Sequence, residues 1–252
     1  MNKHTHKEID FVAVEKPLEI RLGHLTDTYH SLAITMCSPE DIGDLIYGYL
    51  FTEKIITHSS DILGIQTYDN ELGLVSEVKL DKSIAYKSFL NKRNGMVHAS
   101  CGVCGKTEID DLLTYNYPSF QSKHKNIPTK IIQSLPGKLN NHQQAFTKTG
   151  GLHASALFDT NGELMAVKED IGRHNALDKL IGYALKHQLM PLSNTIVLLS
   201  GRVSFELVHK SLMAGVKTIV AIGAPSSLSL EVAKFNELEI YGFVKATSYN
   251  HY

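Results

Sequence analysis

The sequence has few cysteines, no long apolar run and no excess of charge of one sign, and each shortage excludes a class of protein. Three cysteines among 252 residues are too few for a disulfide framework. The longest apolar runs, at residues 196–199 and 219–222, fall far short of the roughly 18 to 20 residues of a membrane span. We therefore expect no membrane crossing, and cysteines that serve catalysis, redox chemistry or metal binding.

Charge and composition narrow the choice further. Lys and Arg number 25 against 26 Asp and Glu, so the chain offers no positive field to a phosphate backbone, and nucleic acid is not an expected partner. Hydrophobic residues at 43% and charged residues at 20% fit an ordinary globular chain of one large domain or two modest ones. The N-terminus, MNKHTHKEIDFVAVEKPLEI, lacks a continuous apolar region and a small-residue cleavage site, so we expect a cytoplasmic protein without a signal peptide.

The first half of the chain is rich in β-prone runs. FVAVE, LEIRL and SLAIT alternate with turn residues, which predicts antiparallel strands. A helix is predicted next, because Ser38 and Asp41 have the spacing of a capping box and an apolar stripe follows at helical spacing (Ile42, Leu45, Ile46, Tyr49 and Leu50). Further strands are predicted at Ile62 to Tyr68, Gly73 to Leu80 and Ser83 to Leu90.

The second half reads as a hairpin followed by strand–helix units. Residues 115–126 lack apolar periodicity and are predicted to be a linker, with helices at 129–139 and 141–147 after it. Strands LHASALFD and ELMAVKED meet at Asn161-Gly162, a strong hairpin signal. Helices at 173–187, 205–213 and 228–235 then alternate with strands at 195–199, 218–222 and 238–244.

These elements predict an α/β chain, α+β overall, with two domains. A strand-rich domain would span residues 1–120 and end in a cysteine loop, and an α/β domain would span residues 121–252. The second domain is predicted to be a three-layer structure, with helices on both faces of a mixed, largely parallel sheet.

The first candidate for chemistry is the cysteine pair in CGVCGK. Cys101 and Cys104 stand two residues apart, an arrangement that lowers the pKa of one thiol and raises its nucleophilic fraction. Half of a zinc site, a redox or sulfur-relay pair, and an incidental pair are the competing interpretations. No second Cys or His pair completes four zinc ligands at ordinary spacing, and the pair does not begin a helix as in thioredoxin-like proteins. SCGVCGKT also lacks the first glycine of a phosphate-binding P-loop.

The second candidate is a set of polar, Gly-rich segments that each follow a strand and precede a helix. They are EDIGRHN at 169–175, SGR at 200–202 and GAPSS at 223–227. Strand carboxyl ends and helix N-termini favour anions, and Arg173 and Arg202 would add positive charge there. His153, after Gly151, and His174 stand at element boundaries from which an imidazole can reach a ligand. Each segment alone is an ordinary turn, but three at one edge favour a site for a phosphate-bearing ligand, which would include Ser200 and Gly201.

Motifs along nearly the whole chain resemble the formate dehydrogenase accessory sulfurtransferase (FdhD) family. They include SPEDIGDLIYGYLFTEKII, CGVCGK, TGGLHASALFD, GELMAVKEDIGRHNALDKLIG, LLSGRVSFELVHKSLMAG and AIGAPSSLSLEVA. The resemblance implies a sulfurtransferase that accepts sulfur from a cysteine desulfurase as a persulfide on Cys101, with Cys104 as the second thiol. The sulfur would pass to a molybdenum cofactor, bis(molybdopterin guanine dinucleotide), before that cofactor enters formate dehydrogenase. A homodimer and no zinc are expected, and a guanine nucleotide is expected to mimic the cofactor.

The resemblance also assigns cofactor contacts to the C-terminal segment, at Phe243, Val244, Lys245, Ala246, Thr247 and Ser248. Lys245 replaces an arginine of the family pattern, and a glycine is missing, so a point charge stands where a bidentate fork is usual. The family's second domain is similar to the cytidine deaminase fold, but this chain lacks the deaminase zinc signature and is not expected to deaminate bases. A non-catalytic chaperone for the cofactor, with incidental cysteines, is the alternative function.

Overall fold

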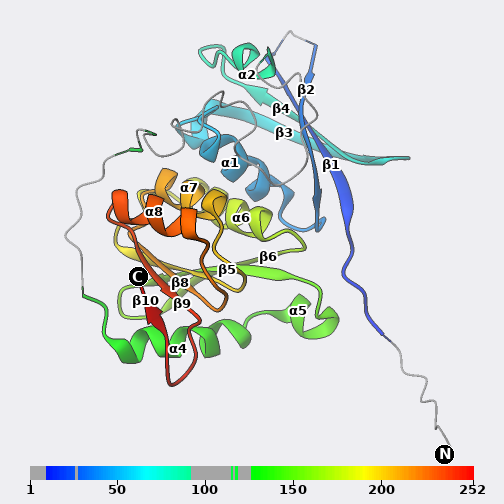
Figure 1. The fold of residues 1–252 in the computed structure, drawn as a ribbon. Helices are drawn as coiled ribbons and strands as arrows, with labels where there is room; N and C mark the ends of the chain where they lie inside the picture. Colours follow the sequence, from blue (N-terminus) through cyan, green and yellow to red (C-terminus); the bar gives the residue numbers. More distant parts are fainter. Residues whose placement is uncertain (1–9, 26–27, 92–114, 116, 119–125) are drawn as a thin grey trace, which may run out of the picture.

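The computed structural model describes residues 10–25, 28–91, 115, 117–118 and 126–252. Cys101, Cys104 and the predicted loop around them lie outside these residues, as does most of the predicted linker. In the described part, a four-stranded sheet, a helix, a layer of three helices, a six-stranded sheet and two further helices follow one another through the molecule (Figure 1).

The first sheet has the strand order β2-β1-β4-β3, with only β1 and β4 parallel. Leu18, Ile20 and Leu22 alternate along β1 and are buried in one core with the apolar stripe of α1, which confirms the helix predicted from that stripe. The elements are β1 (Lys16–Gly23), β2 (His30–Cys37), α1 (Ile42–Thr52), β3 (Ile62–Asn70) and β4 (Gly73–Leu80), with a short 3₁₀ helix at Ser59–Asp61.

The second sheet has the order β10-β9-β8-β7-β5-β6. It is mixed, as predicted, but not largely parallel. Only β7–β8 and β8–β9 are parallel pairs, because β5, the first strand of the hairpin, lies antiparallel between β6 and β7. The strands are β5 (His153–Asp159), β6 (Leu164–Asp170), β7 (Thr195–Leu199), β8 (Thr218–Ala221), β9 (Glu239–Gly242) and β10 (Asn250–His251).

Helices cover both faces of this second sheet, as predicted (Figure 1). Along β7, Val197 and Leu199 belong to the core on one face, and Ile196 and Leu198 belong to the core on the other. Burial on both faces explains why this strand is a continuous apolar run. The first face carries α6 (Arg173–Lys186), α7 (Phe205–Met213) and α8 (Ser227–Phe235), and the second carries α4 (Thr129–Asn140) and α5 (Gln144–Thr149).

Residues 16–80, which form the first sheet and α1, are called the first sheet unit below. Helix α1 joins this unit to the second sheet, because it packs on the first sheet and also directly on α6. The backbones come so close that a Cβ atom on Gly48 would lie 1.8 Å from the carbonyl oxygen of Asp178. A Cβ atom on Gly182 would lie 1.9 Å from the carbonyl oxygen of Asp44. Glycine is therefore required at both positions, since any side chain would push the helices apart.

Three local predictions are wrong. The chain forms helix α2 (Lys87–Asn91) where a strand was predicted at 83–90, because the Asp81 carboxylate accepts from the backbone N–H and the hydroxyl of Ser83 and turns the chain. Ser38 does not cap α1, whose N-cap is Asp41. The Ser38 hydroxyl instead accepts from the backbone N–H of Ile171, so a tertiary contact replaces the local one. The FVAVE run at 11–15 also forms no strand.

The domain boundary at residue 120 and the likeness to the cytidine deaminase fold stay predictions. No helix in the described ranges combines the length and apolar character needed to cross a membrane.

Candidate functional site

The candidate site lies at the edge of the second sheet where the strands β6, β7, β8 and β9 end. These four strands run in one direction, since β6 and β7 are both antiparallel to β5, and β8 and β9 are parallel to β7. The polar segments predicted from sequence follow three of these strands, and β5 starts at the same edge with His153. The topology therefore brings the predicted residues to one side of the molecule.

His153, Gly201 and Arg173 converge at this edge. A Cβ atom on Gly201 would lie 3.2 Å from His153 Nδ1 and 3.9 Å from Arg173 Cδ, so the bare glycine makes room for both side chains. The neighbouring Ser200 is fixed by two bonds with β5. Its hydroxyl accepts from the backbone N–H of Ala154, and its own N–H donates to the Ala154 carbonyl.

Positive charge gathers around His153. Burial is the main cause that lowers the pKa of its imidazole, and the nearby cations Arg173, His174 and Arg202 lower it further. His153 is therefore neutral at pH 7. The Nε of Arg173 is buried and has no hydrogen-bond partner among the described residues. A buried unpaired donor is costly, and a bound anion would satisfy it.

His174 is held from the next helix. Its Nε2 lies 3.3 Å from Ser204 Oγ and 3.8 Å from Glu206 Oε2. Hydrogen bonding to His174 is the main cause that lowers the pKa of Glu206 to about 2, so this carboxylate is ionised at neutral pH. An ionised partner orients the imidazole at the start of α6 and balances part of the positive charge of the edge.

Backbone contacts tie the loops after β7, β8 and β9 together. A Cβ atom on Gly223 would lie 2.6 Å from the carbonyl oxygen of Gly201, so the first two loops touch. Phe243, at φ 55°, donates its N–H to the Gly223 carbonyl and joins the third loop to them. The loops thus form one continuous rim, from which the half-exposed Phe243 side chain projects.

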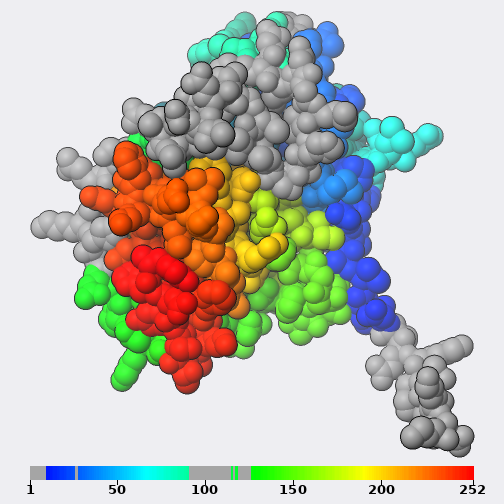
Figure 2. All heavy atoms as spheres, viewed as in Figure 1, coloured from blue at the N-terminus to red at the C-terminus, as the bar shows by residue number. Residues whose placement is uncertain are grey.

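The remaining residues of the predicted C-terminal segment, 244–248, are partly buried in the core and partly exposed. The Val244 side chain is buried in the core, so it faces away from any ligand at the surface. Lys245, Ala246, Thr247 and Ser248 are exposed, in a turn that the Lys245 N–H closes on the Ser248 carbonyl at 2.8 Å. Figure 2 shows this C-terminal part, in red, on the outer surface beside α8, in orange.

Arg173 and Arg202, which lie near His153, are called the cation cluster below. A cavity of about 560 Å³ opens beside His153, next to this cluster. This volume is in the range of pockets that hold small ligands. It lies between α4, α5 and the sheet edge, and its lining includes three predicted residues, Gly151, His153 and Ser200. A second cavity of about 650 Å³ lies near the ends of α1 and α6 and is mostly apolar, but it holds none of the predicted residues. Chemistry, rather than size, favours the first cavity.

The structure thus groups Gly151, His153, Ser200 and Gly201 with Arg173. Lys245–Ser248 follow Phe243 and Val244, whose N–H groups donate to the carbonyls of Gly223 and Ala221. Sequence reasoning missed Ser204 and Glu206, although a serine before a helix with an acid in the first turn is a recognisable N-terminal signal. It also missed the α4 and α5 side of the cavity, whose polar residues resemble any exposed helix face. Among the described residues, no three His, Cys, Asp or Glu side chains gather as metal ligands.

Comparisons with known proteins agree on one family. The model of the FdhD/NarQ family matches residues 13–252. The chain is 39% identical over 251 residues to the sulfur carrier protein FdhD of Streptomyces coelicolor, covering 96% of this chain and 87% of that protein. It is 40% identical over 247 residues to the protein of the same name from Saccharolobus solfataricus, covering 98% and 90%.

A solved structure shares the fold. It is a crystal structure from Desulfotalea psychrophila, provisionally described as a formate dehydrogenase accessory protein. The TM-score is 0.71 at 24% sequence identity, and the match covers 96% of this chain and 88% of that chain.

Proposed function

Because the chain belongs to the FdhD/NarQ family, we propose that it is a sulfur carrier that serves the maturation of a formate dehydrogenase. The observation that carries this proposal is the match to relatives named sulfur carrier proteins over almost the whole length of the chain. The motif CGVCGK supplies the thiols that such a role needs.

In the loading step, the Cys101 thiolate attacks the outer sulfur of a persulfide on a cysteine desulfurase. A new S–S bond forms to Cys101, the S–S bond of the donor breaks, and the donor cysteine leaves as a thiolate. The outer sulfur keeps its proton, and the step consumes no oxidant or reductant. The product is a persulfide on Cys101.

In the delivery step, the outer sulfur leaves as sulfide, which requires two electrons. The Cys104 thiol supplies them by forming a disulfide with Cys101. The cargo that receives the sulfur is the molybdenum cofactor bis(molybdopterin guanine dinucleotide). Its diphosphate groups are anions, and Arg173 and Arg202 beside His153 supply the positive charge that would attract them.

The loading step is tested by incubating the purified chain with a cysteine desulfurase and cysteine, followed by mass spectrometry of its peptides. We expect the mass of one added sulfur atom on the Cys101 peptide, lost in Cys101→Ala. Cys37→Ala is the matched control, since Cys37 is buried and burial raises the pKa of its thiol to about 12. A Cys101→Ala chain that still matures formate dehydrogenase fully would refute the persulfide route.

The site geometry also favours a second function, a chaperone that binds the cofactor without carrying sulfur. This alternative needs only the cation cluster and the cavity beside it. Guanosine diphosphate, used as a probe, separates the two: a chain that binds it through Arg173 but never acquires sulfur is a chaperone. Metal analysis of the purified chain tests the remaining alternative, a zinc-binding module.

A further inference from the structure

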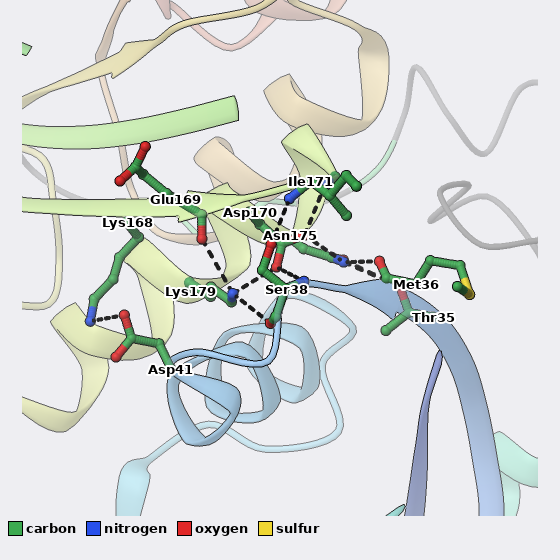
Figure 3. A network of polar contacts seen from close by, with 11 residues as sticks. Thr35, Met36, Ser38, Asp41, Lys168, Glu169, Asp170, Ile171, Asn175 and Lys179 are labelled. Carbon is green, nitrogen blue, oxygen red and sulfur yellow. Dashed lines mark hydrogen bonds and ion pairs between the residues drawn. The ribbon is translucent and has the colours of Figure 1, made fainter. Parts of the chain in front are cut away.

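Residues 170–175 run from the end of β6 through the turn at 171–172 into the start of α6, which carries Arg173 and His174. A buried polar network fixes this segment, called the turn below (Figure 3). The Asp170 carboxylate is fully buried. Its Oδ1 accepts from the Gly172 N–H at 2.8 Å and from Asn175 Nδ2 at 3.2 Å. Its Oδ2 accepts from the Ser38 N–H at 3.1 Å and pairs with Lys179 Nζ at 2.6 Å.

Lys179 completes the charge balance of this network. Its ammonium group is also fully buried and donates to the carbonyls of Ser38 and Glu169, in addition to the Asp170 carboxylate. All three donors of the ammonium group therefore have an acceptor. A buried ion pair adds little net stability, because its formation must repay the loss of hydration, but it fixes the groups that it joins.

Part of the network comes from the first sheet unit. The Ser38 hydroxyl accepts from the Ile171 N–H at 3.1 Å, two residues before Arg173. Asn175 Nδ2 donates to the Met36 carbonyl at 2.8 Å, one residue after His174. Contacts from the end of β2, seen in Figure 3 at Met36 and Ser38, thus hold the chain on both sides of residues 173 and 174.

We infer that Ser38, Asp170 and Asn175 are positioning residues, through which the first sheet unit sets the geometry of Arg173 and His174 for an anionic ligand. This inference rests on the proposed function. It adds that the anion site at the edge of the second sheet depends on Ser38, which is far away in the sequence, as well as on Asp170 and Asn175, which flank the two residues.

The chain offers a matched control for this role. Thr52, at the end of α1, is also a buried hydroxyl that joins the first unit to α6. It donates to Asp178 Oδ1 at 3.1 Å and accepts from Lys210 Nζ at 3.0 Å. Like Ser38, Thr52 joins the first sheet unit to α6, but its partners Asp178 and Lys210 lie outside residues 170–175. Ser38→Ala and Thr52→Val therefore remove comparable hydroxyls, only one of which supports the turn.

The experiment measures the affinity of the full chain for guanosine diphosphate by calorimetry, beside a thermal melt of each variant. We expect Ser38→Ala to bind about tenfold more weakly than the wild type, the effect of one lost supporting hydrogen bond. Thr52→Val should bind like the wild type, whatever its melting temperature. Equal affinity in Ser38→Ala and the wild type, or equal weakening in both variants, would overturn the inference.

Two further measurements keep the test decisive. The imidazole resonances of His174 in a histidine NMR spectrum should shift in Ser38→Ala and stay in place in Thr52→Val, a change that lost stability alone does not produce. Asn175→Ala, which removes the donor to the Met36 carbonyl without adding a charge, should repeat the weakening in a second position. A wild-type chain that binds no nucleotide would refute the anion site itself, whereas binding that is indifferent to Ser38 and Asn175 refutes only their positioning role.

Discussion

Helix α1 crosses helix α6 at two glycines, and the substitution Gly48→Ala tests that crossing directly. The added Cβ would lie 1.8 Å from the Asp178 carbonyl oxygen, about 1.6 Å short of the 3.4 Å at which ordinary contacts begin. It would also lie 2.9 Å from the Gly182 N–H nitrogen. Both obstacles are backbone atoms, so no side-chain rotation relieves the clash and the helices must separate.

The expected loss follows from two opposing terms. Separation of the helices strains the packing around the crossing, and overpacking of this kind costs about 3 kcal/mol of unfolding free energy. Alanine returns about 1 kcal/mol, because it favours the helix more than glycine does. The net loss is about 2 kcal/mol, which lowers the melting temperature of a chain of this size by about 4 to 8 °C.

The assay is thermal and urea unfolding of the wild type and two variants. Gly43→Ala is the control, because Gly43 lies on the same helix and a Cβ there meets nothing within 4 Å. We expect Gly43→Ala to gain up to about 1 kcal/mol from helix propensity alone. If Gly48→Ala proves as stable as Gly43→Ala, the close approach of α1 and α6 is wrong.

Two further predictions concern buried charge. Burial is the largest cause that lowers the pKa of His153, and the positive charge of Arg173 and Arg202 lowers it further. A bound diphosphate opposes this second cause, so binding should raise the pKa of His153 and take up a proton, and the affinity for guanosine diphosphate should rise as the pH falls toward the ordinary imidazole range. Calorimetry in buffers of different ionisation enthalpy measures this uptake, and binding heats that do not depend on the buffer would contradict it. Lys210→Met removes the cation 2.9 Å from the buried Asp178 carboxylate and should cost about 3 to 5 kcal/mol at neutral pH. Urea unfolding checks this loss, and a cost within about 1 kcal/mol would show that Asp178 is not held as an ion.

Much of the fold could be predicted from sequence because its signals are local. The hairpin at Asn161-Gly162 is an example, since Gly162 has the positive φ of 79° that the turn requires. The series of helices and strands after residue 170 follows from apolar periodicity in the same way. Strand order is not local, so the sequence did not reveal that β5 separates β6 from β7.

The candidate site was predictable to the extent that topology alone determines it. Polar turns that follow strands running in one direction lie at the same edge of the sheet, which is why Gly201 and Arg173 meet. No comparable rule predicts which side chains from distant parts of the sequence form hydrogen bonds. The sequence offers no sign that Ser38 would support the Ile171 N–H rather than cap its own helix.

Helix α6 shows the physical limit of pattern reading most clearly. Its apolar stripe predicts one buried face, yet Asp178 and Lys179, which ordinarily mark a solvated face, are almost completely buried as well. They can be buried because α1 covers this second face and brings Thr52 as a polar partner. Ser38 comes from the segment between β2 and α1, and Lys210 comes from α7. The approach of α1 in turn depends on Gly48 and Gly182. Charged residues on a helix that contains glycine are therefore buried between helices only where a second helix has a glycine at the crossing and polar partners are within reach. These residues come from separate parts of the chain, so no single segment of the sequence predicts the contact.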